Sequence, residues 1–254
     1  MRFFRSIYLF EKQQYCWLDV HSNAALPCLQ NEFLTNPFLA PSSEFIFLSK
    51  QDNYKFVPSF MGKRIFAFAE NYYKNSFKKQ KKFPLFFEKG TQSLISENEP
   101  VSIHRFIKEG AKIWGESELA VIVSETHEVF AVTLVNDITM EHPCHEGHDH
   151  HLPFFKGQVG FCPCSSYLFP PEVLNQYKVQ AYHDGELLRE GTSEQQIYPI
   201  SELLPWLATW IKLTPGDMIL LGAPPRVTER KFLQIGSKFK VVLNNTFSLE
   251  NTFI

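Results

Sequence analysis

Two short runs of apolar, mostly β-branched residues lie in the middle of the chain, Glu118 to Ser124 and Val129 to Val135. Four polar residues separate them. Runs of this composition around a segment of hairpin-loop length are typical of two antiparallel strands. If the last residue of the first run lies opposite the first residue of the second, the register places Glu116 opposite Asp137 at the far end of the hairpin.

This register brings three acidic residues together. Side chains alternate along a strand, so Glu116 and Glu118 share a face, and Asp137 lies beside them. Like charges this close repel, and burial would raise their pKa values, unless a cation neutralises them. A cluster of carboxylate oxygens suits a hard divalent cation, Mg²⁺ or Mn²⁺ before Ca²⁺. The residues alone leave a second interpretation open, an exposed strand end with three solvated acids.

The rest of the chain predicts strands and turns with few helices. Residues 1–60 alternate short extended runs with proline-containing loops, which indicates a small β-rich N-terminal region ahead of a main domain over 61–254. Arg64 to Ala69 predicts a buried strand, followed by a short helix over Glu70 to Lys79. Asp184-Gly185 predicts the turn of another hairpin. Because strands and helices do not alternate regularly, the pattern favours a mixed, mostly β fold.

The C-terminal third predicts one helix and one more hairpin. A helix capped by Ser201 would place five apolar residues in the core: Leu203, Leu204, Leu207, Trp210 and Ile211. The final hairpin is expected around Asn244-Asn245, between Lys238 to Leu243 and Phe247 to Phe253. These apolar positions predict core packing and no cofactor site.

Composition narrows the class of protein. The chain has 254 residues, 44% of them hydrophobic, and a formal net charge of −2. This predicts a soluble globular protein without a nucleic-acid partner, since no long basic patch interleaves with aromatic residues. No run approaches the roughly 18 apolar residues of a membrane span, so no membrane partner is expected. Five cysteines without a disulfide framework favour a cytoplasmic location.

Two features after the hairpin could carry chemistry. Five of the nine histidines fall between Glu141 and His151, which is compatible with a transition-metal site, with a polar loop, or with a histidine that reaches the neighbouring acids. Lys156 follows four residues that are apolar or proline, which would partly desolvate its ammonium group and lower its pKa. A solvated lysine is the alternative.

Six segments occur in a characteristic order: Arg64–Tyr72, Pro84–Lys89, Glu116–Val121, Asn136–Thr139, Arg189–Ser193 and Thr214–Pro224. Glu-Ser-Glu-Leu-Ala-Val and Asn-Asp-Ile-Thr within them are similar to the Glu-x-Glu-Leu-Ala-Val and Asn-Asp-Val-Ser metal motifs of the fumarylacetoacetate hydrolase family. The order of the segments resembles that family over roughly residues 60 to 254. The resemblance implies a mixed β-roll, a homodimer, a metal ion on Glu116, Glu118 and Asp137, and Lys156 as the active-site lysine.

The resemblance also implies substrate contacts and shows two departures. Asn71 and Tyr72 match a Gly-x-Asn-Tyr turn, so they either contact substrate or serve as a helix cap and a packed ring. Asn75 stands where the family has a histidine that activates water, and an amide cannot act as a general base. Ala223 replaces a threonine hydroxyl, and Arg226 could grip a substrate carboxylate in its place, although a surface arginine is the alternative.

The implied function is a metal-dependent enzyme that acts on a small 2-oxo acid or 1,3-dicarbonyl compound. Carbon–carbon hydrolysis, decarboxylation and tautomerisation would all pass through a stabilised enolate. Because hydrolysis needs an activated water and position 75 offers no base, decarboxylation or tautomerisation is expected to exceed hydrolysis. The alternative is a catalytically silent relative that keeps the fold as a binding or assembly protein.

Overall fold

The structure is a computed structural model that describes residues 2–28, 36–60, 64–73, 84–124, 126–145 and 151–254. Asn75, the lysines between 78 and 82, and His148 and His150 lie outside the described residues. Within these ranges, strands far outnumber helices, so the expected mixed, mostly β fold is confirmed. The α-helices of the described residues are α1 (His104–Lys108), α2 (Leu152–Lys156) and α3 (Ile200–Ala208).

A seven-stranded sheet forms the centre of the described molecule, in the order β7-β6-β17-β10-β11-β13-β8. Its strands are β6 (Ile65–Ala69), β7 (Leu85–Lys89), β8 (Leu94–Ser96), β10 (Ser117–Val123), β11 (Val129–Asn136), β13 (Cys162–Cys164) and β17 (Met218–Leu220). Every residue of β10 is buried. This explains its nearly continuous apolar sequence, because both of its faces pack against other parts of the protein.

The predicted hairpin consists of β10 and β11, and its register is correct at the acidic end. Glu118 lies opposite Val135, and the backbone N–H of Asp137 donates to the carbonyl of Glu116 at 2.9 Å. The predicted register is wrong at the turn, where Val129 pairs with Val123 rather than with Ser124. The register shifts there because β11 carries one extra residue, as in a β-bulge.

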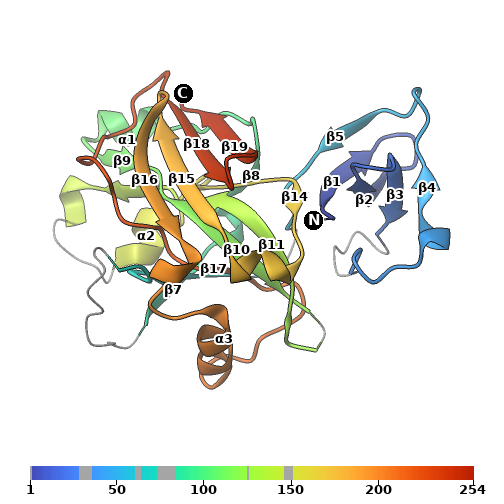
Figure 1. The fold of residues 1–254 in the computed structure, drawn as a ribbon. Coiled ribbons are helices and arrows are strands. Elements are labelled where there is room, and N and C mark those ends of the chain that lie inside the picture. Colours follow the sequence, from blue (N-terminus) through green and yellow to red (C-terminus); the bar gives the residue numbers. More distant parts are fainter. Residues whose placement is uncertain (1, 29–35, 61–63, 74–83, 125, 146–150) are drawn as a thin grey trace.

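A four-stranded sheet packs over β10 and β11 (Figure 1), and apolar residues of both sheets share one core cluster. Its order is β16-β15-β18-β19, with strands β15 (Lys178–His183), β16 (Glu186–Thr192), β18 (Lys238–Leu243) and β19 (Phe247–Thr252). Both expected C-terminal hairpins are therefore confirmed. Leu119 and Val121 of β10 pack with Val179 and Val241 in this core. Ala120 belongs to a second cluster on the opposite face of β10.

The N-terminal strands form a six-stranded sheet that lies to one side of the molecule (Figure 1). The order is β14-β1-β2-β3-β4, and β5 pairs with β1. The bounds are β1 (Phe4–Leu9), β2 (Gln14–Asp19), β3 (Ala24–Pro27), β4 (Ile46–Phe47), β5 (Tyr54–Phe56) and β14 (Tyr167–Leu168). The pairing of β1 with β14 joins the first residues of the chain to a segment far along the sequence. The domain boundary at residue 60 stays a prediction.

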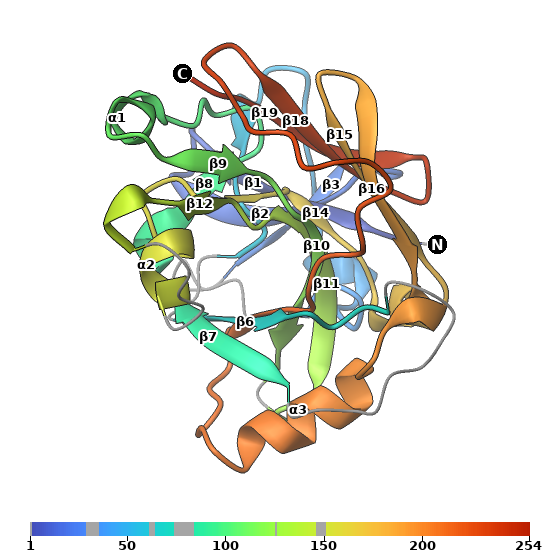
Figure 2. The ribbon, with the colours of Figure 1, turned by 90° about the vertical axis from the view of Figure 1, so that its left-hand side faces the viewer.

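Short elements complete the described fold. Strands β9 (Lys112–Trp114) and β12 (Thr139–Glu141) pair as a ribbon directly beside the acidic end of the hairpin. Single 3₁₀ turns cover Ser42–Glu44, Thr91–Ser93, Pro143–His145, Pro171–Asn175 and Ser193–Gln195. Helix α3 lies at the end of the molecule away from the C-terminus (Figure 2).

Sequence expectations about two helices differ from the structure. Of the helix expected over Glu70 to Lys79, the described residues 70–73 are not helical, because Tyr72 forms a β-bridge with Gln196, and the remainder lies outside the described residues. Helix α3 begins at Ile200, without a cap from Ser201, and ends at Ala208. Trp210 therefore falls beyond the helix and is 67% exposed, outside the core in which the helical pattern had placed it.

A candidate metal centre in an open cleft

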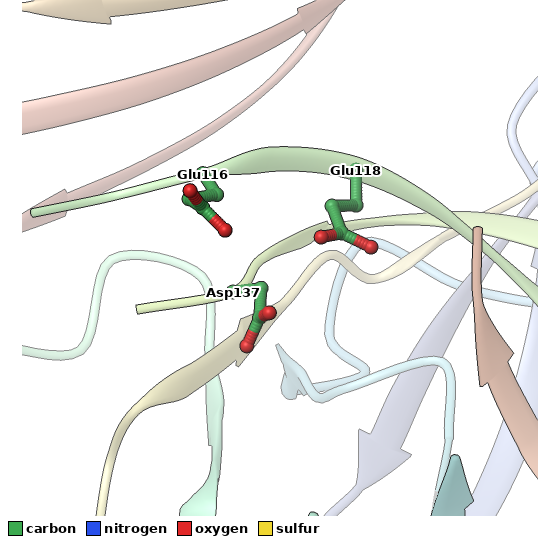
Figure 3. A group of neighbouring side chains, drawn as sticks. All are labelled: Glu116, Glu118 and Asp137. Carbon is green, nitrogen blue, oxygen red and sulfur yellow. The ribbon is translucent and has the colours of Figure 1, made fainter. Parts of the chain in front are cut away.

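Glu116, Glu118 and Asp137 converge at the acidic end of the β10–β11 hairpin. Each offers one carboxylate oxygen, and these oxygens lie within 4.8 Å of one another. Figure 3 shows the three side chains projecting in the same direction from neighbouring strands. Glu118 and Asp137 are buried, whereas the side chain of Glu116 remains 18% exposed. The group could hold a metal ion, because its donors are the hard oxygen ligands that divalent cations such as Mg²⁺ prefer.

Glu118 is the acid that most needs a cation. The backbone N–H of Gly222 donates to its Oε2 at 2.8 Å, and no lysine, arginine or histidine of the described residues forms an ion pair with it. Burial, followed by the negative charge of Asp137, raises the pKa of Glu118 well above its ordinary value. Its carboxyl group therefore holds either a proton or a cation.

Lys156 reaches the acids from the end of α2, and its catalytic role stays a prediction. Its ammonium group donates three hydrogen bonds, to Glu116 Oε2 at 2.8 Å, Asp137 Oδ2 at 2.6 Å and Thr139 Oγ1 at 2.6 Å. The expected fall in its pKa is wrong. Burial acts in that direction, but the charges of Asp137 and Glu116 outweigh it and raise the pKa of Lys156 above its ordinary value. The group therefore stays an ammonium ion and cannot act as a base.

Two further cations at the acids were not identified from the sequence. Lys89, at the end of β7, is fully buried, and its ammonium group donates to Asp137 Oδ1 at 2.6 Å and to the carbonyl of Lys156. Arg189, on β16, donates to Glu116 Oε1 at 2.7 Å and to the carbonyl of Pro224 at 2.6 Å. Both residues lie in the quoted motifs. The position of Lys89 could have been predicted from the alternation of side chains along its strand. Lys89 lies two residues after Phe87, so both side chains point to the same, buried face of β7.

Glu116 is held in its ionised form by two neighbouring cations. Burial alone would raise the pKa of Glu116, but Lys156 and Arg189 outweigh it and lower the pKa to about 2. The indole N–H of Trp114 also donates to Glu116 Oε1 at 3.2 Å. Glu116 and Glu118, only two residues apart, thus have opposite pKa shifts. The reason is that Lys156 and Arg189 both form ion pairs with Glu116 and neither does so with Glu118.

The acids open into a cleft of about 1190 Å³. Its walls come from the end of β6, from β16 and from the segment after β17, and all three acids line it. Tyr72, Ala223 and Arg226 also line this cleft. No histidine is among its lining residues within the described ranges. His142, the first residue of the histidine-rich segment, instead forms a hydrogen bond with Glu109 at 3.3 Å and accepts from the backbone N–H of Cys144.

Asn71 and Tyr72 hold the wall of the cleft together. The amide of Asn71 donates to the carbonyls of Tyr198 and Leu221 at 3.0 and 2.9 Å, and its oxygen accepts from the N–H of Tyr198 at 2.9 Å. The hydroxyl of Tyr72 lies 2.5 Å from that of Tyr177. The expected helix cap at Asn71 is wrong, because its amide bonds the backbone of two distant segments and no helix begins in the described chain there. Tyr72 is the packed ring of that interpretation. Contact between either residue and a substrate stays a prediction.

The sequence pattern described as "Fumarylacetoacetate (FAA) hydrolase C-terminal" matches residues 62–254. The chain belongs to the fumarylacetoacetate hydrolase family. The match spans most of the chain, including β10, β11 and the segments that supply Lys89, Lys156 and Arg189 to the acids. The family resemblance read from the motifs is therefore confirmed.

Individual relatives agree with the family in fold. An uncharacterized protein from Staphylococcus saprophyticus is 25% identical over 206 residues, which cover 74% of this chain and 67% of that protein. Among solved structures, 5-carboxymethyl-2-hydroxymuconate delta-isomerase from Mycobacterium smegmatis has a TM-score of 0.79 at 15% identity and covers 100% of this chain and 98% of its own. Maleylpyruvate hydrolase from Sphingobium sp. SYK-6 has a TM-score of 0.73 at 16% identity, covering 100% and 99%. These likenesses show the fold.

None of the helices among the described residues is both long enough and apolar enough to cross a bilayer.

Proposed function

We propose that this protein is a metal-dependent enzyme that acts on a small 2-oxo acid or 1,3-dicarbonyl compound. The observation that carries the proposal is Glu118, a buried carboxylate without an ion-pair partner in the described residues, directly beside Asp137. A buried acid of this kind is costly unless it is protonated or bound to a cation. The family membership and the open cleft support the same conclusion.

In this proposal Glu116, Glu118 and Asp137 hold Mg²⁺ or Mn²⁺, with Ca²⁺ as a weaker fit. When bound, the ion supplies Lewis-acid polarisation of a substrate carbonyl. Lys156 fixes two of the acids and keeps its positive charge close to the reacting oxygens, where it stabilises the enolate that forms. Lys89 and Arg189 orient Asp137 and Glu116, so their carboxylates need little rearrangement.

The reaction type follows from the groups that could accept a proton. Lys156 stays protonated, and no histidine lines the cleft within the described ranges. Hydrolysis requires a base to activate water, which is typically worth ~10²–10⁴ in rate, whereas decarboxylation and keto–enol isomerisation chiefly require stabilisation of the enolate. We therefore propose that decarboxylase or tautomerase activity exceeds acylpyruvate hydrolysis.

The experiment that tests this function is a pair of assays, oxaloacetate decarboxylation and acylpyruvate hydrolysis, with Mg²⁺ and after chelation. The proposal expects metal-dependent turnover of oxaloacetate that exceeds acylpyruvate hydrolysis, and a loss of about 10²–10³ in kcat for Lys156→Met. A variant with alanine at all five histidines between 142 and 151 serves as the second control. Efficient hydrolysis that survives loss of these histidines would mean that another group activates water.

A catalytically silent relative that serves in binding or assembly is the second candidate. This candidate is favoured because Asp137 and Glu116 already form ion pairs within the protein, so their charges are balanced without a metal ion. The partners are Lys89, Lys156 and Arg189. The open cleft favours the enzyme, since a relative without a substrate has no use for acids that face a space of this size. Absence of turnover on any 2-oxo acid or 1,3-dicarbonyl compound, in protein that binds Mg²⁺, would select the silent relative.

The proposal includes a cytoplasmic homodimer, because members of the resembled family are commonly homodimers and the cysteine content suits a reducing compartment. Light scattering of the purified protein tests the assembly. A mass of one chain would contradict it.

A further inference from the structure

The carboxylate of Glu116 receives more hydrogen bonds from the described residues than either of the other two acids does. Its Oε1 accepts from Arg189 at 2.7 Å and from the indole N–H of Trp114 at 3.2 Å. Its Oε2 accepts from Lys156 at 2.8 Å. An ionised carboxylate oxygen has room for about two donors. The described donors therefore fill Oε1 and leave a free position on Oε2 alone.

The other two acids keep more positions for a cation. Asp137 accepts one hydrogen bond on each oxygen, in both cases from a buried lysine. Glu118 accepts the backbone N–H of Gly222 on Oε2. Glu116 is thus the acid at which neighbouring groups restrict how a cation can be held, because the second donor on its Oε1 is Trp114.

The Trp114 ring is fixed by its neighbours. Trp114 ends β9 and lies opposite Thr139 in the β9–β12 ribbon. The guanidinium carbon of Arg230 lies 4.0 Å from the centre of the ring, a close cation–π contact. Phe232 packs against the ring edge-on, with ring centres 6.3 Å apart. The indole N–H therefore keeps its direction toward Oε1 of Glu116.

We propose that Trp114 makes the three acids prefer Mg²⁺ to Ca²⁺, by leaving Glu116 only one oxygen with which to bind a cation. This inference rests on the proposed function and assigns the choice of metal ion to a residue outside the acids. Mg²⁺ requires near-ideal octahedral geometry, whereas Ca²⁺ takes roughly six to eight oxygen ligands and accepts both oxygens of one carboxylate. A carboxylate limited to one oxygen therefore favours Mg²⁺. Trp114 is a positioning residue, because it acts on the cation through Glu116.

The test is a calorimetric titration of MgCl₂ and of CaCl₂ into the wild type and Trp114→Phe. Phenylalanine keeps an aromatic face for Arg230 and removes the N–H donor, which frees a position on Oε1 of Glu116. The ratio of the Ca²⁺ dissociation constant to the Mg²⁺ dissociation constant falls about three- to tenfold in Trp114→Phe, because one hydrogen bond gives way to a Ca²⁺ ligand. A general disturbance of the site weakens both ions, which have equal charge, and leaves this ratio unchanged.

Trp210→Phe is the matched control, because it makes the same substitution at an exposed ring beyond α3. It keeps the wild-type ratio. The role of Trp114 is wrong if Trp114→Phe binds both ions with the wild-type ratio, or if Trp210→Phe lowers the ratio as much. In either case binding of Mg²⁺ to the wild type still supports the proposed function. If the wild type binds neither ion, the proposed metal centre fails and the role of Trp114 fails with it.

Thermal melting shows whether Trp114→Phe is folded. If it is not, Arg230→Gln tests the same step, because it removes the cation that holds the indole and leaves the acids unchanged. The ratio of dissociation constants falls in this variant as well, since a ring without its cation–π contact holds the N–H less firmly on Glu116. A wild-type ratio in folded Arg230→Gln would contradict the proposal.

Discussion

Replacing Lys89 with methionine tests whether protein cations compensate the acids in the absence of metal. Lys89 is fully buried, and its ammonium group donates to Asp137 Oδ1 at 2.6 Å and to the carbonyl of Lys156. Methionine fills nearly the same volume, so the change mainly removes a charge and two hydrogen bonds. Loss of one partner from a buried ion pair costs about 3–5 kcal/mol. For a chain of this size, we expect a fall in Tm of roughly 6–20 °C for Lys89→Met without metal.

Addition of Mg²⁺ should reduce this difference. Without Lys89 the acids carry one more uncompensated negative charge, so they should bind a divalent cation more tightly than in the wild type. A tenfold gain in affinity corresponds to about 1.4 kcal/mol of additional stabilisation once Mg²⁺ is well above both dissociation constants. The assay is thermal and urea unfolding of both proteins, with MgCl₂ and with chelator.

Lys178→Met provides the matched control, since Lys178 forms a half-exposed ion pair with Glu190 at 2.8 Å. Pairs of this kind are worth about 0–1 kcal/mol, so the control should unfold close to wild type and show no response to Mg²⁺ beyond that of the wild type. If Lys89→Met were as stable as Lys178→Met, the buried charge network around Asp137 would be wrong. If Lys89→Met were less stable than the wild type by the same amount with and without Mg²⁺, the link between that network and a metal site would be wrong.

Three further predictions concern the residues around Glu118. Gly222→Ala should destabilise the protein by about 1–2 kcal/mol or more, measured by urea unfolding, because Gly222 has φ +90° and a methyl group there would lie 2.9 Å from Cβ of Asn71; unchanged stability would contradict the close approach. The pKa of Glu118 is raised, so Mg²⁺ must displace its proton, and the affinity for Mg²⁺ should increase with pH until Glu118 ionises. Calorimetry in buffers of different ionisation enthalpy should show proton release on Mg²⁺ binding to the wild type and none for Glu118→Gln. In the metal-free protein, the raised pKa of Glu118 adds to the free energy of unfolding below the ordinary pKa of about 4.5, and this contribution is lost as pH rises through the raised pKa. Glu118→Gln should therefore make the free energy of unfolding less dependent on pH. A wild type whose stability showed no such pH dependence would contradict the buried, unpaired acid.

The sequence predicted the acidic end of the hairpin but not its turn. The alternation of side chains fixes which residues share a face, so Glu116, Glu118 and Asp137 converge as expected. The extra residue in β11 near Val129 is a local irregularity that alternation does not reveal. Its effect is confined to the turn, because the register between the bulge and the acids is regular.

The charges that surround the acids required the tertiary structure. Lys156 was expected to have a lowered pKa from its apolar neighbours in sequence, whereas acids from two other segments determine its actual shift. Lys89 and Arg189 reach the site from β7 and β16, which are distant from the hairpin in sequence. Trp210 was expected in the core because it continues the helical spacing of apolar residues. It is exposed because the helix ends at Ala208, and the periodicity of a sequence does not show where a helix ends.

The most direct test of the metal centre is a calorimetric titration of Mg²⁺ into the wild type and Glu118→Gln in parallel. Mg²⁺ is the better probe because it prefers oxygen ligands, so the histidine-rich segment between Glu141 and His151 contributes little to the signal. We expect one Mg²⁺ site per chain in the wild type and an affinity at least about tenfold lower in the variant, which lacks a charged ligand. Equal affinity in the two proteins, or no binding to the wild type, would contradict a metal centre at Glu116, Glu118 and Asp137.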